Sequence, residues 1–266
     1  MTLMLQPNER ATYADLARIA CPAGTSTWTP IPHTLVVDKV KEAFDASNLP
    51  VTLAGEEYGL ASEGKRMFGV LNYHVHGETE TSLAIGACSS IDRSIGLKYC
   101  SGAGMVVCSN LCFSADGIVV SRKHTTHILA HMDDMISRLL AHAWGQYKTT
   151  KADLDSLKGL TMTDDMAYAA FGVALGRGWL TPARLSRAMS YWRKPPHVEH
   201  QTRDLFAWYQ ACNHGLKTSA PQDSLAHHGQ LHQQALQMRE GVSGAWEVAP
   251  RVLPVVEAAA DVAGEE

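Results

Sequence analysis

Three adjacent basic residues, Arg122, Lys123 and His124, are the residues of this sequence best suited to binding chemistry. They follow a segment with the pattern of a strand and precede one with the pattern of a long helix. Backbone N–H groups at a helix start bind anions, and basic side chains beside them add positive charge. This combination predicts a phosphate-binding site, and the turn Asp92-Arg93-Ser94 between two expected strands could face it. The alternative is a set of ordinary solvated residues.

A second group of basic residues is interleaved with aromatic residues later in the chain. Between Met166 and Gln222, seven basic residues stand against two acidic ones, which gives this stretch a charge of +5. Arginine neutralises phosphates, and exposed rings stack on unpaired bases, so the pattern indicates a platform for single-stranded nucleic acid. The alternative is that the rings belong to the core and the cations lie outside. The candidate phosphate contacts are Arg184, Arg187, Arg193, Lys194 and Lys217, and the interleaved rings are Trp179, Tyr191, Trp192, Trp208 and Tyr209.

The thirteen histidines raise the question of a metal site. His127 and His131, four residues apart on the expected long helix, could chelate a metal, with Asp134 one turn on. Such a site needs a further ligand from elsewhere, and Arg138 in the same stripe repels a cation. We therefore favour a solvent-facing polar stripe over a metal site.

A second metal pattern combines Cys108 and Cys112 with His124 and His127. It resembles a zinc finger, but residues four apart in an extended strand lie about 13 Å apart, too far to share one ion. The cysteines are therefore expected to be buried thiols, and no cofactor is predicted. The sequence also contains no nucleophile motif and no glycine-rich phosphate loop ahead of a helix.

The elements that must position these residues follow from the spacing of apolar residues. Two helices are predicted first, over residues 13–20 and 35–47. From 51 to 123, short apolar runs alternate with Gly, Asn, Asp and Ser, which is typical of strands with tight turns. Their short connections favour an antiparallel meander. The expected strands are 51–61, 66–76, 81–90, 94–100, 104–110 and 117–121.

The remainder of the chain has the pattern of helices. A long helix is predicted from about 126 to 147, with one apolar face. Capping residues then start helices at Thr163, Thr181 and Thr202, and a last helix covers 222–240. The predicted fold class is α+β, with N-terminal helices, an antiparallel sheet followed by a long helix, and a helical C-terminal half.

Composition limits the class of protein. The 266 residues are 45% hydrophobic and 19% charged, which is typical of a folded chain. The net charge of -4 argues against a generally basic nucleic-acid binder, although not against a local basic face. No apolar run reaches the roughly 18 residues of a membrane span, and no signal peptide is evident, so we expect a cytoplasmic protein without membrane contact.

The charge pattern suggests one domain and a tail. Residues 1–240 are expected to form a single α+β domain, with the sheet part at about 48–125 and the helical part at about 126–240. Residues 241–266 form an acidic C-terminal tail. Such a tail could compete with a polyanion for the basic stretch, or simply keep the protein in solution.

Four segments resemble the successive motifs of a phage and plasmid protein family known as domain of unknown function 932. They are Ser89–Ser94, Val106–Ser114, Arg122–Thr125 and Trp208–Lys217. The resemblance implies a phage, prophage or plasmid origin in bacteria but supplies no established activity. Asn110, within the second segment, joins the candidate contact residues.

The likeness runs from about Trp28 to Met238, with three departures. Ile91 stands where the pattern has histidine, Ser109 where it has aspartate, and His214 where it has threonine. No catalytic role is therefore carried over to position 91. The sheet followed by a long helix also looks like the core of phage single-strand annealing proteins, which is an analogy of fold alone.

These observations favour a non-enzymatic protein that binds single-stranded nucleic acid for a mobile element. We expect it to assist recombination, annealing or replication, and to act as a homo-oligomer. One alternative is a protein that inhibits a host defence component by binding a host protein. A further alternative is a metal-dependent hydrolase that uses His124, His127, His131 and Asp134.

Overall fold

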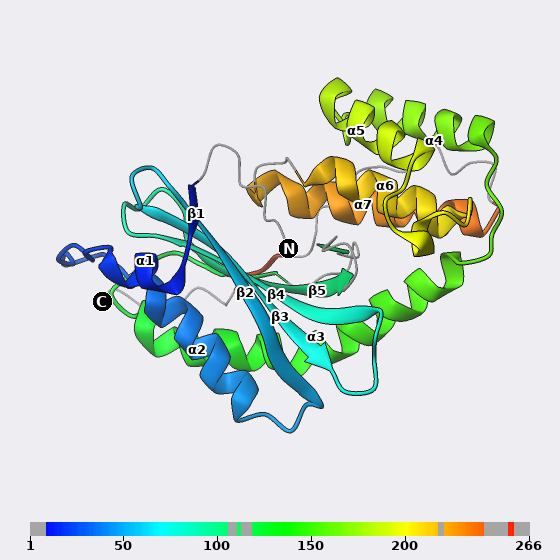
Figure 1. The fold of residues 1–266 in the computed structure, drawn as a ribbon. Coiled ribbons are helices and arrows are strands. Elements are labelled where there is room, and N and C mark those ends of the chain that lie inside the picture. The colour runs from blue at the N-terminus through cyan, green and yellow to red at the C-terminus, as the bar shows by residue number, and fades with distance from the viewer. Residues whose placement is uncertain (1–8, 106–110, 113–118, 218–220, 242–254, 258–266) are drawn as a thin grey trace, which may run out of the picture.

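The computed structural model describes residues 9–105, 111–112, 119–217, 221–241 and 255–257. Its fold is α+β, as predicted, with N-terminal helices, a sheet, a long helix and a helical C-terminal part (Figure 1). The strands join in the order β1-β2-β3-β4-β5-β7-β8, with β6 beside β5. They are β1 (Glu9–Ala11), β2 (Val51–Ala61), β3 (Arg66–Val75), β4 (Thr81–Ser90), β5 (Leu97–Met105), β6 (Leu111–Cys112), β7 (Val119–Arg122) and β8 (Val255–Glu257).

The central strands form the expected antiparallel meander. β2 to β5 pair in chain order, and β7 adds antiparallel to β5. Alternate residues such as Leu83 and Ile85 are fully buried in the core that the sheet shares with the helices. The Tyr99 hydroxyl donates to the Val36 carbonyl at 3.1 Å, which ties β5 to helix α2 (His33–Asp45).

β5 corrects the sequence prediction. The residues between the strands expected at 94–100 and 104–110 lie inside β5 and pair with β4. β4 and β5 pack so closely that Gly86 of β4 must lack a side chain, because a Cβ there would lie 2.6 Å from Cys100 Sγ of β5. Most of the strand expected at 104–110 lies outside the described residues.

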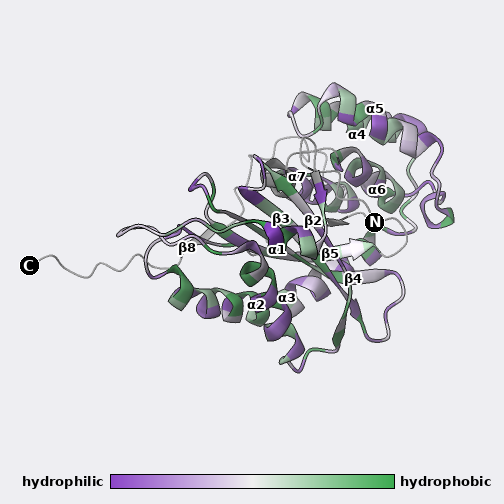
Figure 2. Cartoon of the chain, turned by 60° about the vertical axis from the view of Figure 1, so that its left-hand side comes forward, coloured by the Kyte–Doolittle hydropathy of each residue, from purple (hydrophilic) through white to green (hydrophobic). Residues whose placement is uncertain are grey.

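Helices α1 (Tyr13–Arg18) and α2 (His33–Asp45) come before strands β2 to β7 in the chain, and α3 (Ile128–Leu157) follows them. Hydrophilic and hydrophobic residues both occur along α2 and α3, as expected for helices with one buried face (Figure 2). α3 has 30 residues, about 45 Å at the usual rise, and extends ten residues beyond the predicted end at 147. The second half of α3 is mostly polar, but one side of it is buried and includes Thr150, Leu154 and Leu157.

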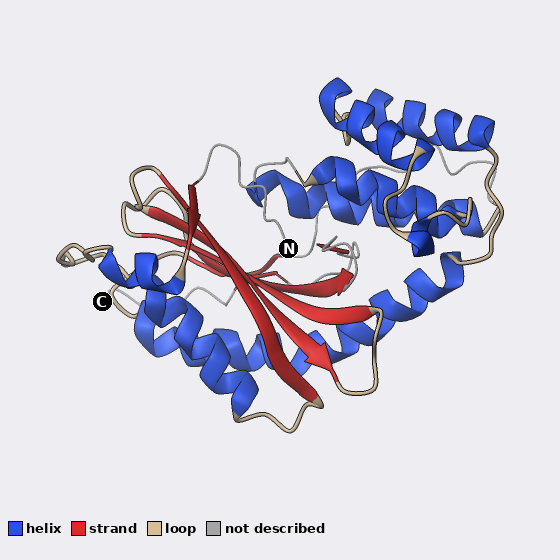
Figure 3. Cartoon of the chain, in the orientation of Figure 1, coloured by secondary structure: helices blue, strands red, loops and turns tan. Residues whose placement is uncertain are grey.

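The helices that follow α3 form the part that we call the bundle (Figure 3). Thr163 and Thr181 cap α4 and α5 as predicted, whereas Asp204, not Thr202, caps α6. Asp204 Oδ1 accepts from the Ala207 N–H at 2.8 Å, which satisfies a free donor in the first turn. The elements are α4 (Asp164–Gly176), α5 (Pro182–Arg193), the 3-10 turn η1 (Val198–His200), α6 (Leu205–Leu216) and α7 (Pro221–Arg239).

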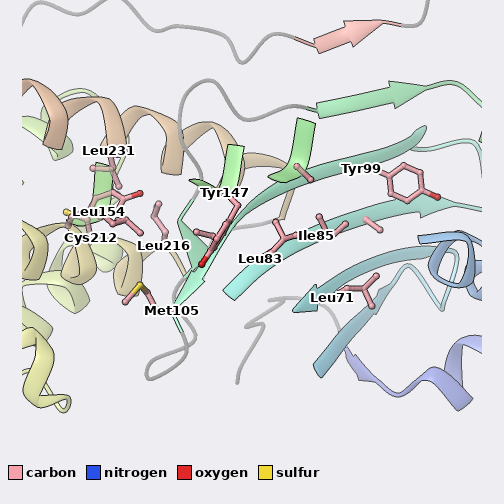
Figure 4. Close-up of a cluster of buried hydrophobic side chains, with 14 of the residues drawn as sticks. Leu71, Leu83, Ile85, Tyr99, Met105, Tyr147, Leu154, Cys212, Leu216 and Leu231 are labelled. Carbon is pink, nitrogen blue, oxygen red and sulfur yellow. The ribbon is translucent and has the colours of Figure 1, made fainter. Parts of the chain in front are cut away.

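One apolar core runs from the sheet into the bundle (Figure 4). Leu154 of α3 belongs to it, together with Cys212 and Leu216 of α6 and Leu231 of α7. α3 thus contributes buried side chains to both parts. No helix in the described ranges is both long and apolar enough to cross a membrane.

β8 lies inside the stretch predicted as an acidic tail. It pairs parallel to β7, with Val255, Val256 and Glu257 opposite Val119, Val120 and Ser121. The residues of the tail on either side of it, 242–254 and 258–266, lie outside the described part of the chain.

Candidate anion-binding site at one end of the sheet

One end of the sheet brings together three segments that are far apart in the sequence. The Ile91 N–H donates to the Lys65 carbonyl at 2.8 Å, so the turns after β2 and β4 touch. Leu97 pairs with Arg122, which places the end of β7 beside the start of β5. Four basic residues have their backbone positions at this end of the sheet, and we call them the sheet-end cluster: Arg66, Arg93, Arg122 and Lys123.

Arg93 is exposed and held in a fixed place. Its φ of +67° lies in the left-handed region, which costs a non-glycine residue about 1 kcal/mol or more. The guanidinium carbon lies 4.7 Å from the centre of the Trp28 ring, and NH2 donates to the Thr25 hydroxyl at 3.2 Å. Ser62 and Glu63, in the turn after β2, also have positive φ. Backbone strain thus gathers at this end of the sheet.

Arg66, Asp92 and Ser94 form a linked polar group at the same place. Arg66 Nε donates to the Ser94 hydroxyl at 2.7 Å and lies 3.9 Å from Asp92 Oδ2. Partial burial raises the pKa of Asp92, but hydrogen bonds from Ser94 and the charge of Arg66 outweigh it, and the pKa is lowered overall. Asp92 therefore stays ionised and accepts hydrogen bonds within the turn. Among the predicted contact residues Asp92, Arg93 and Ser94, Arg93 is the exposed cation.

Arg122 and Lys123 supply the remaining charge. Arg122 NH2 donates to His131 Nε2 at 2.9 Å, so His131 is a neutral acceptor in this arrangement. Lys123 is exposed, and its ammonium group makes no hydrogen bond or ion pair within the described ranges. The cluster therefore carries an excess of positive charge over Asp92.

His124 does not join the cluster, although it was predicted to contact phosphate. Its side chain is buried, and Nε2 lies 3.1 Å from the Ser89 hydroxyl of β4. Burial lowers the pKa of His124, so the ring is neutral near pH 7. The residue therefore fixes the segment before α3 against the sheet.

The second predicted group of basic residues lies in the bundle. Arg184, Arg187 and Arg193 are on α5, Lys194 follows it, and Lys217 ends α6. Arg193 Nε donates to the Tyr168 hydroxyl at 3.2 Å, which is the main reason that the pKa of Arg193 is raised.

The aromatic residues of that stretch are not a stacking surface. Trp192 and Trp208 are 1% and 0% exposed, and Trp179, Tyr191 and Tyr209 are also buried. The arginines occupy the outer positions of amphipathic helices, so the alternative interpretation of the pattern applies to the rings. The two basic groups lie toward opposite ends of α3, the sheet end near its start and the bundle near its end (Figure 1).

The predicted metal ligands do not converge. His131 accepts from Arg122, and Asp134 Oδ2 accepts from Arg138 Nε at 3.0 Å. No group of three or more His, Cys, Asp or Glu that could hold a metal occurs within the described ranges. Cys108 and Asn110 lie outside those ranges, so their predicted roles have no structural counterpart here.

Two residues of the site escaped the sequence analysis as functional candidates, Arg66 and Trp28. Arg66 reaches the turn at Ser94 only because β3 and β4 pair with Arg66 opposite Ser90. Strand register is a long-range property that one sequence does not display. The contact of Trp28 with Arg93 joins residues 65 positions apart, and no local pattern marks it.

Comparisons of the chain with protein-family models, with curated proteins and with solved structures found no match. The resemblance of four short segments to a phage and plasmid family therefore stays a prediction. Support for a function therefore comes from the geometry of the sheet end.

Proposed function

We propose that the protein binds single-stranded nucleic acid, with the sheet-end cluster contacting its phosphates. The observation that carries the proposal is the placement of four basic residues from three distant segments at one end of the sheet. Phosphate contacts supply most of the affinity in sequence-independent binding, and arginine is well suited to them.

Arg93 supports a single strand over a duplex. One side of its guanidinium faces the Trp28 ring, and the residue is exposed. A guanidinium plane offers a surface on which an unpaired base stacks, whereas the bases of a duplex are already stacked on one another. Arg93 thus provides both a charge for a phosphate and a face for a base.

The wider role in recombination, annealing or replication of a mobile element follows from the resemblance, and so does the bacterial setting. The assembly into a homo-oligomer is likewise a prediction. These parts of the proposal are not needed for the binding experiment, which tests the sheet end alone.

The test is fluorescence anisotropy with labelled single-stranded DNA, single-stranded RNA and duplex DNA over a salt series. Three to four phosphate contacts give a slope of log affinity against log salt of about -2 to -3 for a single strand. Arg93→Ala and Lys123→Ala should each weaken binding several-fold and reduce the slope by about 0.7.

The matched control is Lys148→Ala, an exposed lysine in the middle of α3, outside the cluster. It should leave both affinity and slope near the parent values. Absence of binding at low salt contradicts the proposal, and so does an equal loss in Lys148→Ala and Lys123→Ala.

A further inference from the structure

α5 and α6 pack together in the bundle (Figure 1), and they and η1 carry a second group of basic and titratable residues. The Tyr191 ring stacks on His214 with 4.4 Å between ring centres, and its hydroxyl lies 2.6 Å from His200 Nδ1. The helices are in close contact, since a Cβ at Gly215 would lie 2.7 Å from the Arg184 carbonyl oxygen. We call the group the His214 cluster: Arg187, Tyr191, His197, His200, His214 and Lys217.

The charges around His214 are of one sign. Burial is the main cause that lowers the pKa of His214 to about 4, and Lys217, Arg187 and His197 each lower it further. These are the charged or chargeable neighbours that act on it among the described residues, and each of them is basic. Glu199 and Asp204 act with the opposite sign on the neighbouring His200, so the positive charge is local to His214, where Arg187 and Lys217 would attract an anion.

His200 adds an unsatisfied polar atom to the same cluster. It is 1% exposed, and its Nε2 has no hydrogen-bond partner in the described structure. The His197 ring lies 5.6 Å from it, centre to centre, in an edge-on contact. Buried polar atoms are normally paired, and one without a partner often marks a missing ligand or water.

We propose that the His214 cluster binds a phosphate-type anion, held by Arg187 and Lys217 beside the imidazole of His214. Arg187 is exposed and lies one turn before Tyr191 on α5, so it is on the helix face that meets His214. The site is separated from the sheet-end cluster by α3. It therefore stands independently of the proposed function, except where its anion belongs to a nucleic-acid strand.

Binding at this site should take up a proton. A bound anion offsets the charges of Arg187 and Lys217, which removes part of the repulsion that keeps His214 neutral. Affinity should therefore rise as the pH falls toward 4. Sulfate separates this effect from the titration of phosphate itself, because its charge is constant in this range.

The experiment follows the histidine ring signals of the full chain by NMR, with His214→Gln to assign the signal of His214. Inorganic phosphate and sulfate are added up to about 10 mM, tenfold above a Kd of about 1 mM. The expected result is a saturable shift of the His214 signal and a rise in its pKa of at least one unit. Arg187→Ala should weaken binding about tenfold, whereas Arg184→Ala, one turn away on the same helix, should leave it unchanged.

Oligonucleotides with and without a 5′-phosphate identify the source of the anion. A His214 shift that needs the 5′-phosphate indicates a terminal phosphate, and a shift with both indicates backbone phosphates. The proposal is overturned if neither the inorganic anions nor the oligonucleotides shift His214, or if Arg184→Ala reduces binding as much as Arg187→Ala. Unchanged oligonucleotide binding in Arg93→Ala and Lys123→Ala, with the His214 response to inorganic anions retained, sinks the proposed function alone.

Discussion

Basic and aromatic residues occur together at both ends of α3, but the two ends arrange them differently. At the sheet end, Arg93 is exposed and lies over Trp28, in a turn with strained backbone. In the bundle, Trp192 and Trp208 are buried and the arginines of α5 lie outside them. A spacing of three or four residues between cation and ring is what any amphipathic helix produces. Cations that converge from separate turns are the more specific signal.

The largest effect that separates the two ends is expected from truncation of a bundle tryptophan. Trp208 is 0% exposed, and its ring centre lies 5.7 Å from that of Phe171. Trp208→Ala should lower the free energy of unfolding by about 3–5 kcal/mol, as a large cavity in a core does. Urea denaturation measures this, with Trp208→Phe as the milder control. A loss below about 1 kcal/mol means that the ring is available at the surface, as the stacking interpretation required.

Acid should destabilise the bundle next most strongly. Burial lowers the pKa of His200 to about 4 and that of His228 to about 3. A histidine with a lowered folded-state pKa takes up its proton first in the unfolded chain, so stability is lost as the pH falls below about 6.5. Each such group costs about 1.4 kcal/mol per pH unit until the pH reaches its folded-state pKa.

Hydrogen exchange of α6 amides, measured at pH 7 and pH 5 and corrected for intrinsic rates, tests this loss. His228→Gln should remove about a third of the pH dependence, because His200 and His214 lose stability over the same pH range. The same dependence in the variant and the parent would show that His228 does not titrate as its burial demands.

The smallest effects come from a matched pair of glycines. A Cβ at Gly96 would lie 2.7 Å from the Arg122 carbonyl oxygen, whereas one at Gly172 in α4 meets nothing within 4 Å. Gly96→Ala should cost about 1–3 kcal/mol and weaken nucleic-acid binding, because it moves the Arg93 turn away from β7. Gly172→Ala should add about 0.5–1 kcal/mol and leave binding unchanged. Thermal unfolding and anisotropy compare the two, and equal effects on binding remove the special role of the sheet end.

The sequence was sufficient for elements with strong local signals. The bounds of β2 and β4 agree with the prediction, and so do the caps Thr163 and Thr181, because apolar runs and capping residues act over a few positions. The end of α3 was missed because its last turns are polar outside and bury only a narrow stripe. β5 was cut short because Gly102 and Gly104 look like turn residues but pair with β4.

The candidate site was only half visible from the sequence. Arg93, Arg122 and Lys123 are flagged by their type and by the elements beside them. The contribution of Arg66 depends on strand register, and the exclusion of His124 from the site depends on its contact with Ser89. Both are consequences of tertiary packing, which a local pattern does not contain.

The parallel pairing of β8 with β7 has a consequence for the order of assembly. In an unfolded chain the two strands are separated by roughly 130 residues, but α7 ends only about 15 residues before β8. With α7 docked through the Arg239–Ser156 hydrogen bond near the end of α3, only about 15 residues remain to bring β8 to the β7 edge. The last strand of the sheet is therefore expected to join only after the helices have docked, so that protection of the β7 edge reports on the integrity of the distant bundle.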